Sequence, residues 1–233
     1  MRLAIMQPYL FPYLGYFQLA ASVDRFVFYD DVAYIKNGWI NRNRILLGDA
    51  PHYLTVPLNG ASSSRPILDV CIQPRDRLMP KLLAMLHHAY SRAPQYAPVI
   101  RLVERVLSTD TDAIGQLASH SVTETCAYLG IETKFISTST GYGNVMLRGQ
   151  ARVIDICRRE SARLYVNAPG GRTLYDRAAF LDAGIDLAFI EPESGSYTQF
   201  GMPFVPNLSI IDVLMFNRVD TARTMLAIDT VAA

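Results

Sequence analysis

The residues best suited to acid–base chemistry lie near the start of the 233-residue sequence. Asp30 and Asp31 follow a short apolar run, and Tyr9 lies in a proline-containing segment before it. A carboxylate or a phenol can take a proton from an attacking amine or hydroxyl group. We therefore predict Asp30, Asp31 and Tyr9 as catalytic candidates. Adjacent strand residues point to opposite faces, so at most one aspartate should face a given pocket; a turn or helix-cap role is the alternative.

A polar block with two arginines follows Trp39. In an extended chain Arg42 and Arg44 share one face, and the intervening asparagines lie on the other. Two arginines spaced in this way can hold a diphosphate through charge-assisted hydrogen bonds, although a solvated strand edge is the alternative. The predicted substrate-binding residues here are Lys36, Asn41, Arg42, Asn43 and Arg44.

Two other loops carry polar groups that could meet a ligand. Pro8 and Pro12 bend the opening segment and deny it regular structure, which holds Gln7 on a shaped loop. A diglycine turn follows an apolar run near residue 165 and lets backbone amides approach an anion, but it matches neither a dinucleotide fingerprint nor a P-loop. The remaining substrate-binding predictions are Gln7, Tyr13, Asn167, Gly170, Gly171, Arg172, Tyr175, Tyr197 and Gln199.

Strand-length and helix-length segments alternate around these loops. Strands are expected at 2–6, 25–29, 52–58, 67–72, 133–137, 164–167 and 185–190, and helices at 150–163, 174–183 and 209–216. Such alternation implies parallel crossover units. The prediction is an α/β fold with a parallel-rich sheet flanked by helices. The carboxyl ends of its strands would carry the site.

The middle of the chain has a different texture. Three apolar stripes at helical spacing run through residues 78–130, with Thr109 or Asp110 as the expected cap of the third helix and Gly130 as its stop. We predict that this stretch forms a helical sub-domain, an insertion or side lobe within a single domain of residues 1–233.

Several of these segments resemble the WbqC-like family. The resemblance is carried by residues 7–17, by Asp30-Asp31-Val32, by Asn41 to Ile45, by Leu54 to Pro57, by Tyr165 to Tyr175 and by Asn207 to Asp212. Members of that family occur in bacterial gene clusters for surface polysaccharide such as O-antigen. The resemblance implies a role in surface-glycan synthesis, including that of lipopolysaccharide.

The leading functional hypothesis is a transferase that moves an acyl or aminoacyl group onto a nucleotide-activated amino sugar or another small amine. Its substrate would carry phosphate, and an acyl or peptidyl carrier protein is a candidate donor. A nucleotidyltransferase-like enzyme is one alternative, although tyrosines stand where those enzymes carry paired histidines. A non-catalytic partner of a glycan enzyme or carrier is the other. It would show an exposed apolar patch on the middle helices and no deep cleft.

Composition narrows the class of protein. A net charge of +1 gives no basic field for nucleic acid, and no apolar run reaches the length of a membrane span. Three scattered cysteines and four histidines lack metal-ligand spacing, so no metal site is predicted and a cofactor stays unassigned. With no signal peptide pattern, we expect a cytoplasmic protein that does not insert into membranes.

Overall fold

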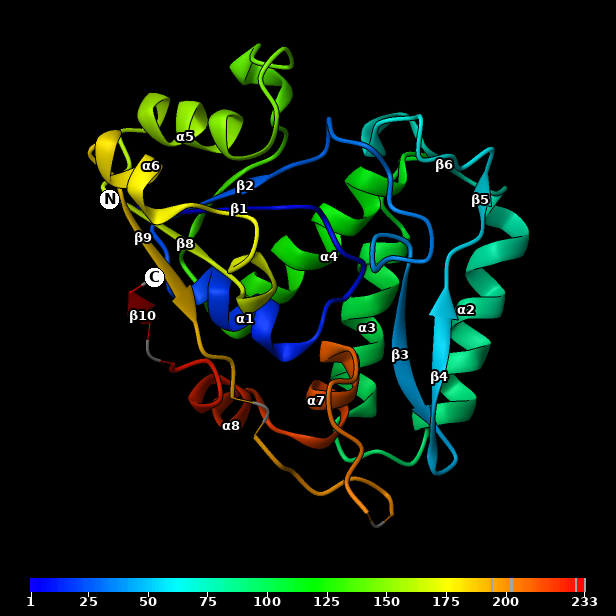
Figure 1. The fold of residues 1–233 in the computed structure, drawn as a ribbon. Coiled ribbons are helices and arrows are strands. Elements are labelled where there is room, and N and C mark those ends of the chain that lie inside the picture. Colours follow the sequence, from blue (N-terminus) through cyan, green and yellow to red (C-terminus); the bar gives the residue numbers. More distant parts are fainter. Residues whose placement is uncertain (194, 202, 229, 233) are drawn as a thin grey trace.

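A mostly parallel sheet forms the centre of the structure, a computed structural model that describes residues 1–193, 195–201, 203–228 and 230–232 (Figure 1). Its strands lie in the order β10-β9-β8-β1-β2-β7. All neighbouring pairs are parallel except β9 and β10. The bounds are β1 Arg2–Met6, β2 Arg25–Phe28, β7 Lys134–Ile136, β8 Leu164–Asn167, β9 Asp186–Ile190 and β10 Thr230–Ala232. The predicted α/β class with a parallel-rich sheet is confirmed.

The sheet is buried on both faces, and its side chains alternate between two apolar clusters. Along β1, Leu3 and Ile5 belong to one cluster and Ala4 to the other. In β2, Val27 joins the first cluster while its neighbours join the second. This alternation follows from the two-residue period of a strand. It explains why the strands read as unbroken apolar runs.

Helices cover both faces of this sheet. The cluster containing Leu3 includes side chains of α5 (Gly149–Arg159) and α6 (Arg177–Asp182). The other cluster includes α1 (Leu14–Ala21) together with the middle and C-terminal helices. Figure 1 shows α5 and α6 on one side of the sheet and α1 and α4 on the other. The parallel strands therefore have both faces protected from water.

The middle of the chain forms α2 (Arg75–Tyr90), α3 (Tyr96–Leu107) and α4 (Ile114–Leu129). Their apolar stripes are buried in the same cluster as α1. The expected stop at Gly130 is confirmed, since this residue ends α4 at φ 69°. The expected cap at Thr109 or Asp110 is wrong, because Ala113 precedes the helix and the hydroxyl of Thr111 accepts from its N–H. The division into one domain with a helical sub-domain stays a prediction.

A long antiparallel hairpin extends beside these helices. It pairs β3 (Arg42–Leu47) with β4 (Ala50–Thr55), and a short pair joins β5 (Leu58–Asn59) to β6 (Cys71–Ile72). The single strand expected at 67–72 is therefore only partly right, because Ile67–Asp69 is a 3₁₀ helix. Figure 1 shows the hairpin lying across from the carboxyl ends of β1 and β2.

Two short helices, α7 (Ile210–Phe216) and α8 (Val219–Thr224), come late in the chain. The side chain of Ser209 accepts a hydrogen bond from the N–H of Ile211 and so caps α7. Among the described helices, none combines the length and the apolar character that crossing a membrane requires.

Candidate functional site

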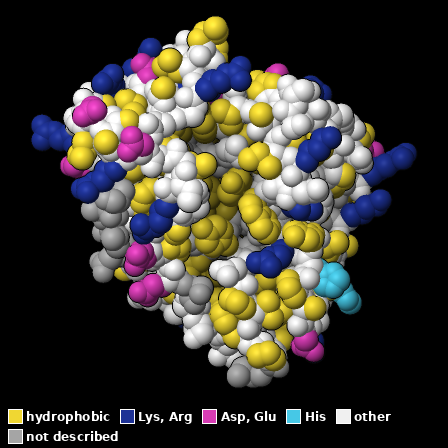
Figure 2. All heavy atoms as spheres, viewed as in Figure 1, with side chains coloured by type: hydrophobic (Ala, Val, Ile, Leu, Met, Phe, Trp, Pro, Cys, Tyr) yellow, Lys and Arg dark blue, Asp and Glu magenta, His cyan; other side chains and the backbone are white. Residues whose placement is uncertain are grey.

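A cleft opens at the carboxyl ends of β1 and β8, where the order of the sheet reverses. From β1 the chain continues to β2 on one side, while β8 lies on the other. The cleft has a volume of about 630 Å³, and Figure 2 shows a hollow with hydrophobic side chains on this face. Open α/β sheets bind their ligands at such a reversal point.

The opening loop forms one wall of the cleft. Its Gln7, Tyr9 and Tyr13 all line the cavity. The loop is strained, because Phe11 has a φ of 40°, which a bulky residue rarely adopts. The side chain of Ser121 in α4 accepts from the Phe11 N–H at 2.9 Å, and the Ser209 hydroxyl donates to the Phe11 carbonyl at 2.7 Å. Residues distant in sequence therefore pin this loop in place.

The diglycine turn forms the opposite wall. Asn167, Gly170 and Gly171 line the cleft, together with Tyr175 after the turn. A Cβ atom on Gly171 would lie 2.8 Å from Nδ2 of Asn167, whereas one on Gly170 would meet nothing within 4 Å. Gly171 is thus required for Asn167 and Tyr175 to approach the turn. The structure brings the opening loop and this turn to one cavity.

The lining is aromatic and electrically neutral. It includes the rings of Tyr9, Tyr13, Tyr16, Tyr29, Trp39 and Tyr175. Burial raises the pKa of Tyr9 and Tyr13, and it does the same for the pKa of Tyr175. These hydroxyls are therefore protonated at neutral pH. Among the described residues, no carboxylate, imidazole or ammonium group lines this cavity. Its polar groups are hydroxyls, amides and backbone.

A side pocket of about 290 Å³ adjoins the cleft. The two cavities share Tyr9, Tyr13 and Trp39. The side pocket adds Asn43 and Arg44 from β3, and Asn207. Arg44 thus joins the polar β3 tract to the opening loop, and of the three predicted arginines only this one lines either cavity in the described part of the chain.

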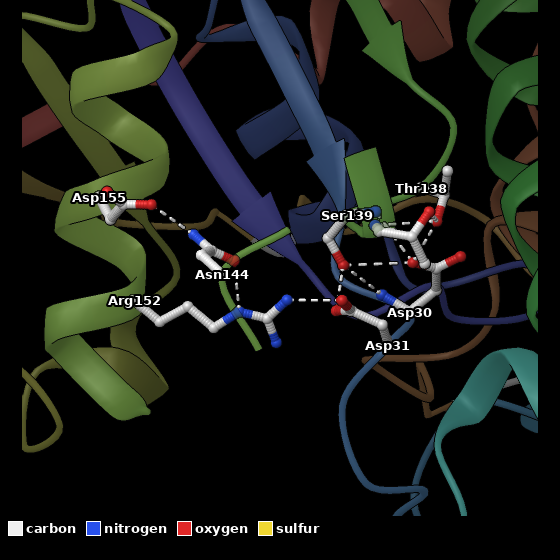
Figure 3. Close-up of polar contacts among 8 residues, drawn as sticks. Asp30, Asp31, Thr138, Ser139, Asn144, Arg152 and Asp155 are labelled. Carbon is white, nitrogen blue, oxygen red and sulfur yellow. Dashed lines mark hydrogen bonds and ion pairs between the residues drawn. The ribbon is translucent and has the colours of Figure 1, made fainter. Parts of the chain in front are cut away.

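The two candidate aspartates lie at the carboxyl end of β2, in a closed polar network (Figure 3). One Asp30 carboxylate oxygen accepts from the Thr138 hydroxyl at 2.9 Å and from the Ser139 N–H at 3.0 Å. Asp31 forms an ion pair with Arg152 of α5, with side chains only 6% and 4% exposed. Neither aspartate is among the described residues that line the cleft.

This network nevertheless touches the cleft through Tyr29. The guanidinium carbon of Arg152 lies 4.9 Å from the centre of the Tyr29 ring, and Tyr29 lines the cavity. The Arg152 Nε also donates to the side-chain oxygen of Asn144 at 2.8 Å. Burial raises the pKa of Tyr29, while the nearby Arg152 charge opposes that shift. Asp31 and Arg152 therefore support one wall of the cleft from behind.

Other predicted binding residues are engaged away from the cleft. Arg42 donates to the Asn37 and Gly38 carbonyls and stacks 4.4 Å from the centre of the Tyr53 ring. Asn41 is buried, accepting from Tyr34 and donating to the carbonyl of Val56. Lys36 is exposed and lines neither cavity.

Arg172 follows the diglycine turn and is not among the described residues that line either cavity. It pairs with Glu191 at 3.4 Å and lies 5.0 Å from the centre of the Phe189 ring. This arginine, which was predicted to bind substrate, is therefore engaged with β9 and the residue after it.

Tyr197 and Gln199 meet at a different buried carboxylate, that of Asp212 in α7. Tyr197 and Gln199 each donate to one Asp212 oxygen at 2.7 Å, and Tyr90 donates to the other at the same distance. Burial raises the pKa of Asp212, although these three donors oppose the shift. The cluster joins α7 to α2, because Tyr90 ends α2.

Several cleft residues were missed in the sequence. Gln150 and Trp39 line the cavity, Asn207 lines the side pocket, and Arg152 supports Tyr29. Trp39 was noted only as an aromatic neighbour of the arginines. Asn207 offered one signal, because it stands in a segment that resembles the WbqC-like family. Within the described residues, no group of three or more His, Cys, Asp or Glu side chains could hold a metal ion.

Fold and cavity together define an α/β protein with a cleft at the reversal point of a parallel sheet. A family model described as the WbqC-like protein family matches residues 7–224. The uncharacterized protein Rv1507c of Mycobacterium tuberculosis is 30% identical over 220 residues, which cover 93% of each chain. No solved structure gives a significant match. The chain belongs to the WbqC-like family, as the resemblance indicated.

Proposed function

We propose that this protein is a transferase of surface-glycan synthesis that acylates the amino group of a sugar held in the cleft. The observation that supports this proposal best is that the opening loop and the diglycine turn line one cavity, at the point where the sheet order reverses. The glycan setting is supported by family membership. The predicted transferase chemistry is the part of this proposal that experiments must establish.

The lining suits an uncharged sugar ring. Tyrosine and tryptophan rings offer apolar faces to the C–H surface of a sugar, and the tyrosine hydroxyls supply donors. The amides of Gln7, Gln150 and Asn167 add hydrogen-bonding groups around the same cavity. The Oε1 of Gln7 is buried without a hydrogen-bond partner among the described residues, so it can accept from the amine of a bound sugar.

The reaction we propose is attack of the sugar amine on an activated acyl group, a thioester or an acyl phosphate. The new bond joins nitrogen to the acyl carbon, and the bond from that carbon to sulfur or oxygen breaks. The leaving group keeps the electron pair and receives the proton lost by nitrogen. Neutral tyrosine hydroxyls such as that of Tyr9 would donate to the developing oxyanion. Asp31 would act as a positioning residue through Arg152 and Tyr29.

The packing of the middle helices supports an enzyme over a non-catalytic partner protein. The latter hypothesis requires an exposed apolar patch on α2, α3 and α4. Leu82, Leu86 and Val103 are instead buried, and Met85 of α2 is 37% exposed. The cavity lies elsewhere, between the opening loop and the diglycine turn.

The test is a thermal-shift screen with nucleotide-linked amino sugars, their hydroxyl analogues and acyl thioesters. A ligand at a hundred times its Kd stabilises the native state by about 2.7 kcal/mol, which corresponds to about 5–10 °C for a chain of this size. We expect amino sugars to raise the Tm of the wild type and of Gly170→Ala, but not of Gly171→Ala. Mass spectrometry should then detect an acylated sugar.

The two glycine variants are matched because only Gly171 has close neighbours. Equal ligand shifts in both variants would place the sugar elsewhere and remove the observation on which the proposal depends. The absence of any response to sugars or acyl donors would also overturn it. If Gly171→Ala does not fold, Gln7→Ala replaces it, with loss of the amino-sugar shift expected.

A further inference from the structure

The side pocket at the end of the cleft carries a positive charge that the cleft itself lacks. Of the described residues that line either cavity, Arg44 is the one with a charged side chain. The two cavities adjoin, because both are lined by Tyr9, Tyr13 and Trp39. A ligand with an uncharged ring in the cleft can therefore extend toward a cation.

Arg44 is held in a defined position. Its Nη2 donates to the Asn207 carbonyl at 3.0 Å, and its guanidinium carbon lies 5.7 Å from the centre of the Trp39 ring. The N–H of Ser209 donates to the Arg44 carbonyl at 2.7 Å. Asn207 has a φ of 57°, an uncommon conformation that orients its carbonyl toward the arginine. A guanidinium fixed in this way needs little reordering to bind a ligand.

The donors of Arg44 are incompletely used. Its Nε is buried and has no hydrogen-bond partner among the described residues, and its one side-chain hydrogen bond there goes to a neutral carbonyl. Arg25 and Arg152 differ, because each is paired with a carboxylate. A buried N–H donor without an acceptor lowers stability. A guanidinium group without a carboxylate partner has the geometry to bind phosphate through two parallel hydrogen bonds. The geometry favours an anion at this position.

We propose that the side pocket is a phosphate subsite, in which Arg44 binds the phosphate of a ligand whose sugar ring lies in the cleft. The inference rests on the proposed function, which places the sugar ring in the cleft. It adds the orientation of the ligand. The phosphate lies beyond Trp39, and the amine lies toward Gln7. The substrate class is thus an amino sugar with a phosphate at the opposite end from its reacting nitrogen.

The test compares glucosamine 6-phosphate, whose phosphate lies across the ring from its amine, with glucosamine by titration calorimetry. One charge-assisted interaction corresponds to about a ten- to hundredfold change in affinity, so the wild type should prefer the phosphorylated sugar by about that factor. Arg44→Ala should lose the preference while still binding glucosamine. Arg42→Ala is the matched control and should keep it, because Arg42 is engaged with Tyr53 and two loop carbonyls.

Each failure has its own signature. A phosphate preference that survives Arg44→Ala, or that Arg42→Ala reduces equally, would overturn the subsite. Equal binding of both sugars by the wild type would overturn it too, while leaving the proposed function intact. Binding of inorganic pyrophosphate through Arg44 with no sugar binding would keep the subsite and overturn the function. If Arg44→Ala does not fold, Arg44→Lys keeps the charge without Nε and should show a reduced preference.

Discussion

The carboxyl edge of the sheet has two halves that use their polar side chains differently. Beyond β2 and β7, Asp30, Asp31 and Arg152 are bonded to protein partners (Figure 3). Beyond β1 and β8, the lining is neutral, and Gln7 has a buried oxygen with no partner in the described chain. In the charged half, these side chains are engaged by other protein groups. In the neutral half, a buried hydrogen-bond acceptor has no partner among the described residues.

This difference teaches where a ligand can bind along an edge that is geometrically similar throughout. Buried charges must be paired, so the aspartates at β2 are engaged in holding α5 and the turn after β7. A buried amide or phenol without a hydrogen-bond partner destabilises the fold less than a buried charge without a counter-ion. Substitutions in the charged half should therefore lower stability, while those in the cleft should change binding more than stability.

The largest expected effect is that of Arg152→Ala. It leaves the Asp31 carboxylate buried without its cation, and breaking a buried pair costs about 3–5 kcal/mol. The free energy of unfolding, measured by urea titration, should fall by that amount. Arg159→Ala is the control on the same helix, since its pair with Asp155 is half exposed and should contribute no more than about 0.5 kcal/mol. Similar losses for both variants would contradict the distinction between buried and exposed pairs.

A smaller loss is expected from Asp30→Ala. Removing this carboxylate leaves the Ser139 N–H without its side-chain acceptor, which should cost about 1–3 kcal/mol in urea titration. Asp30→Asn retains an acceptor oxygen and should recover most of the loss. The same pair tests the catalytic prediction for Asp30. If Asp30→Asn stays folded and loses all turnover, Asp30 acts as a base and the charged half takes part in the reaction.

The smallest effect, and one of opposite sign, is expected from Gln7→Met. A side chain of similar length without the unpartnered oxygen should raise the free energy of unfolding by about 1 kcal/mol. The same change should weaken amino-sugar binding, because the amine loses its acceptor. Thermal denaturation with and without ligand measures both quantities. A variant that is less stable and binds normally would show that Gln7 serves the fold rather than the ligand.

Much of the sheet was predictable because its strands are short apolar runs that end in polar loops. β1 and β8 have the predicted bounds, and β9 differs by one residue. Since parallel strands end at one edge, the meeting of Gln7 with the diglycine turn could also be expected. The start of α4 could not be predicted, because the helix begins after Ala113 and the Thr111 hydroxyl, not Thr109 or Asp110, accepts from the Ala113 N–H.

The partners of the charged residues were not predictable from local pattern. Asp31 meets Arg152 across 121 positions of sequence, and no spacing rule connects them. Arg42 and Arg44 share a face in an extended chain, but Arg42 is captured by Tyr53 and nearby carbonyls. Tyr197 and Gln199 are engaged by the buried Asp212, whose importance depends on burial that the sequence does not display. In each case the tertiary structure, and not the local sequence pattern, determines which partner the side chain has.

The strained opening loop has a consequence for how the protein becomes active. Ser209 holds the Phe11 carbonyl, and the N–H of Ile210 donates to the Pro12 carbonyl at 2.8 Å. The opening loop is thus held by a segment 198 positions later, so a nascent chain that ends before Ser209 lacks the contacts that hold this wall of the cleft. Ligand binding in the cleft would then begin only after synthesis has passed Ser209, which makes such binding a sensitive indicator that this long-range contact has formed.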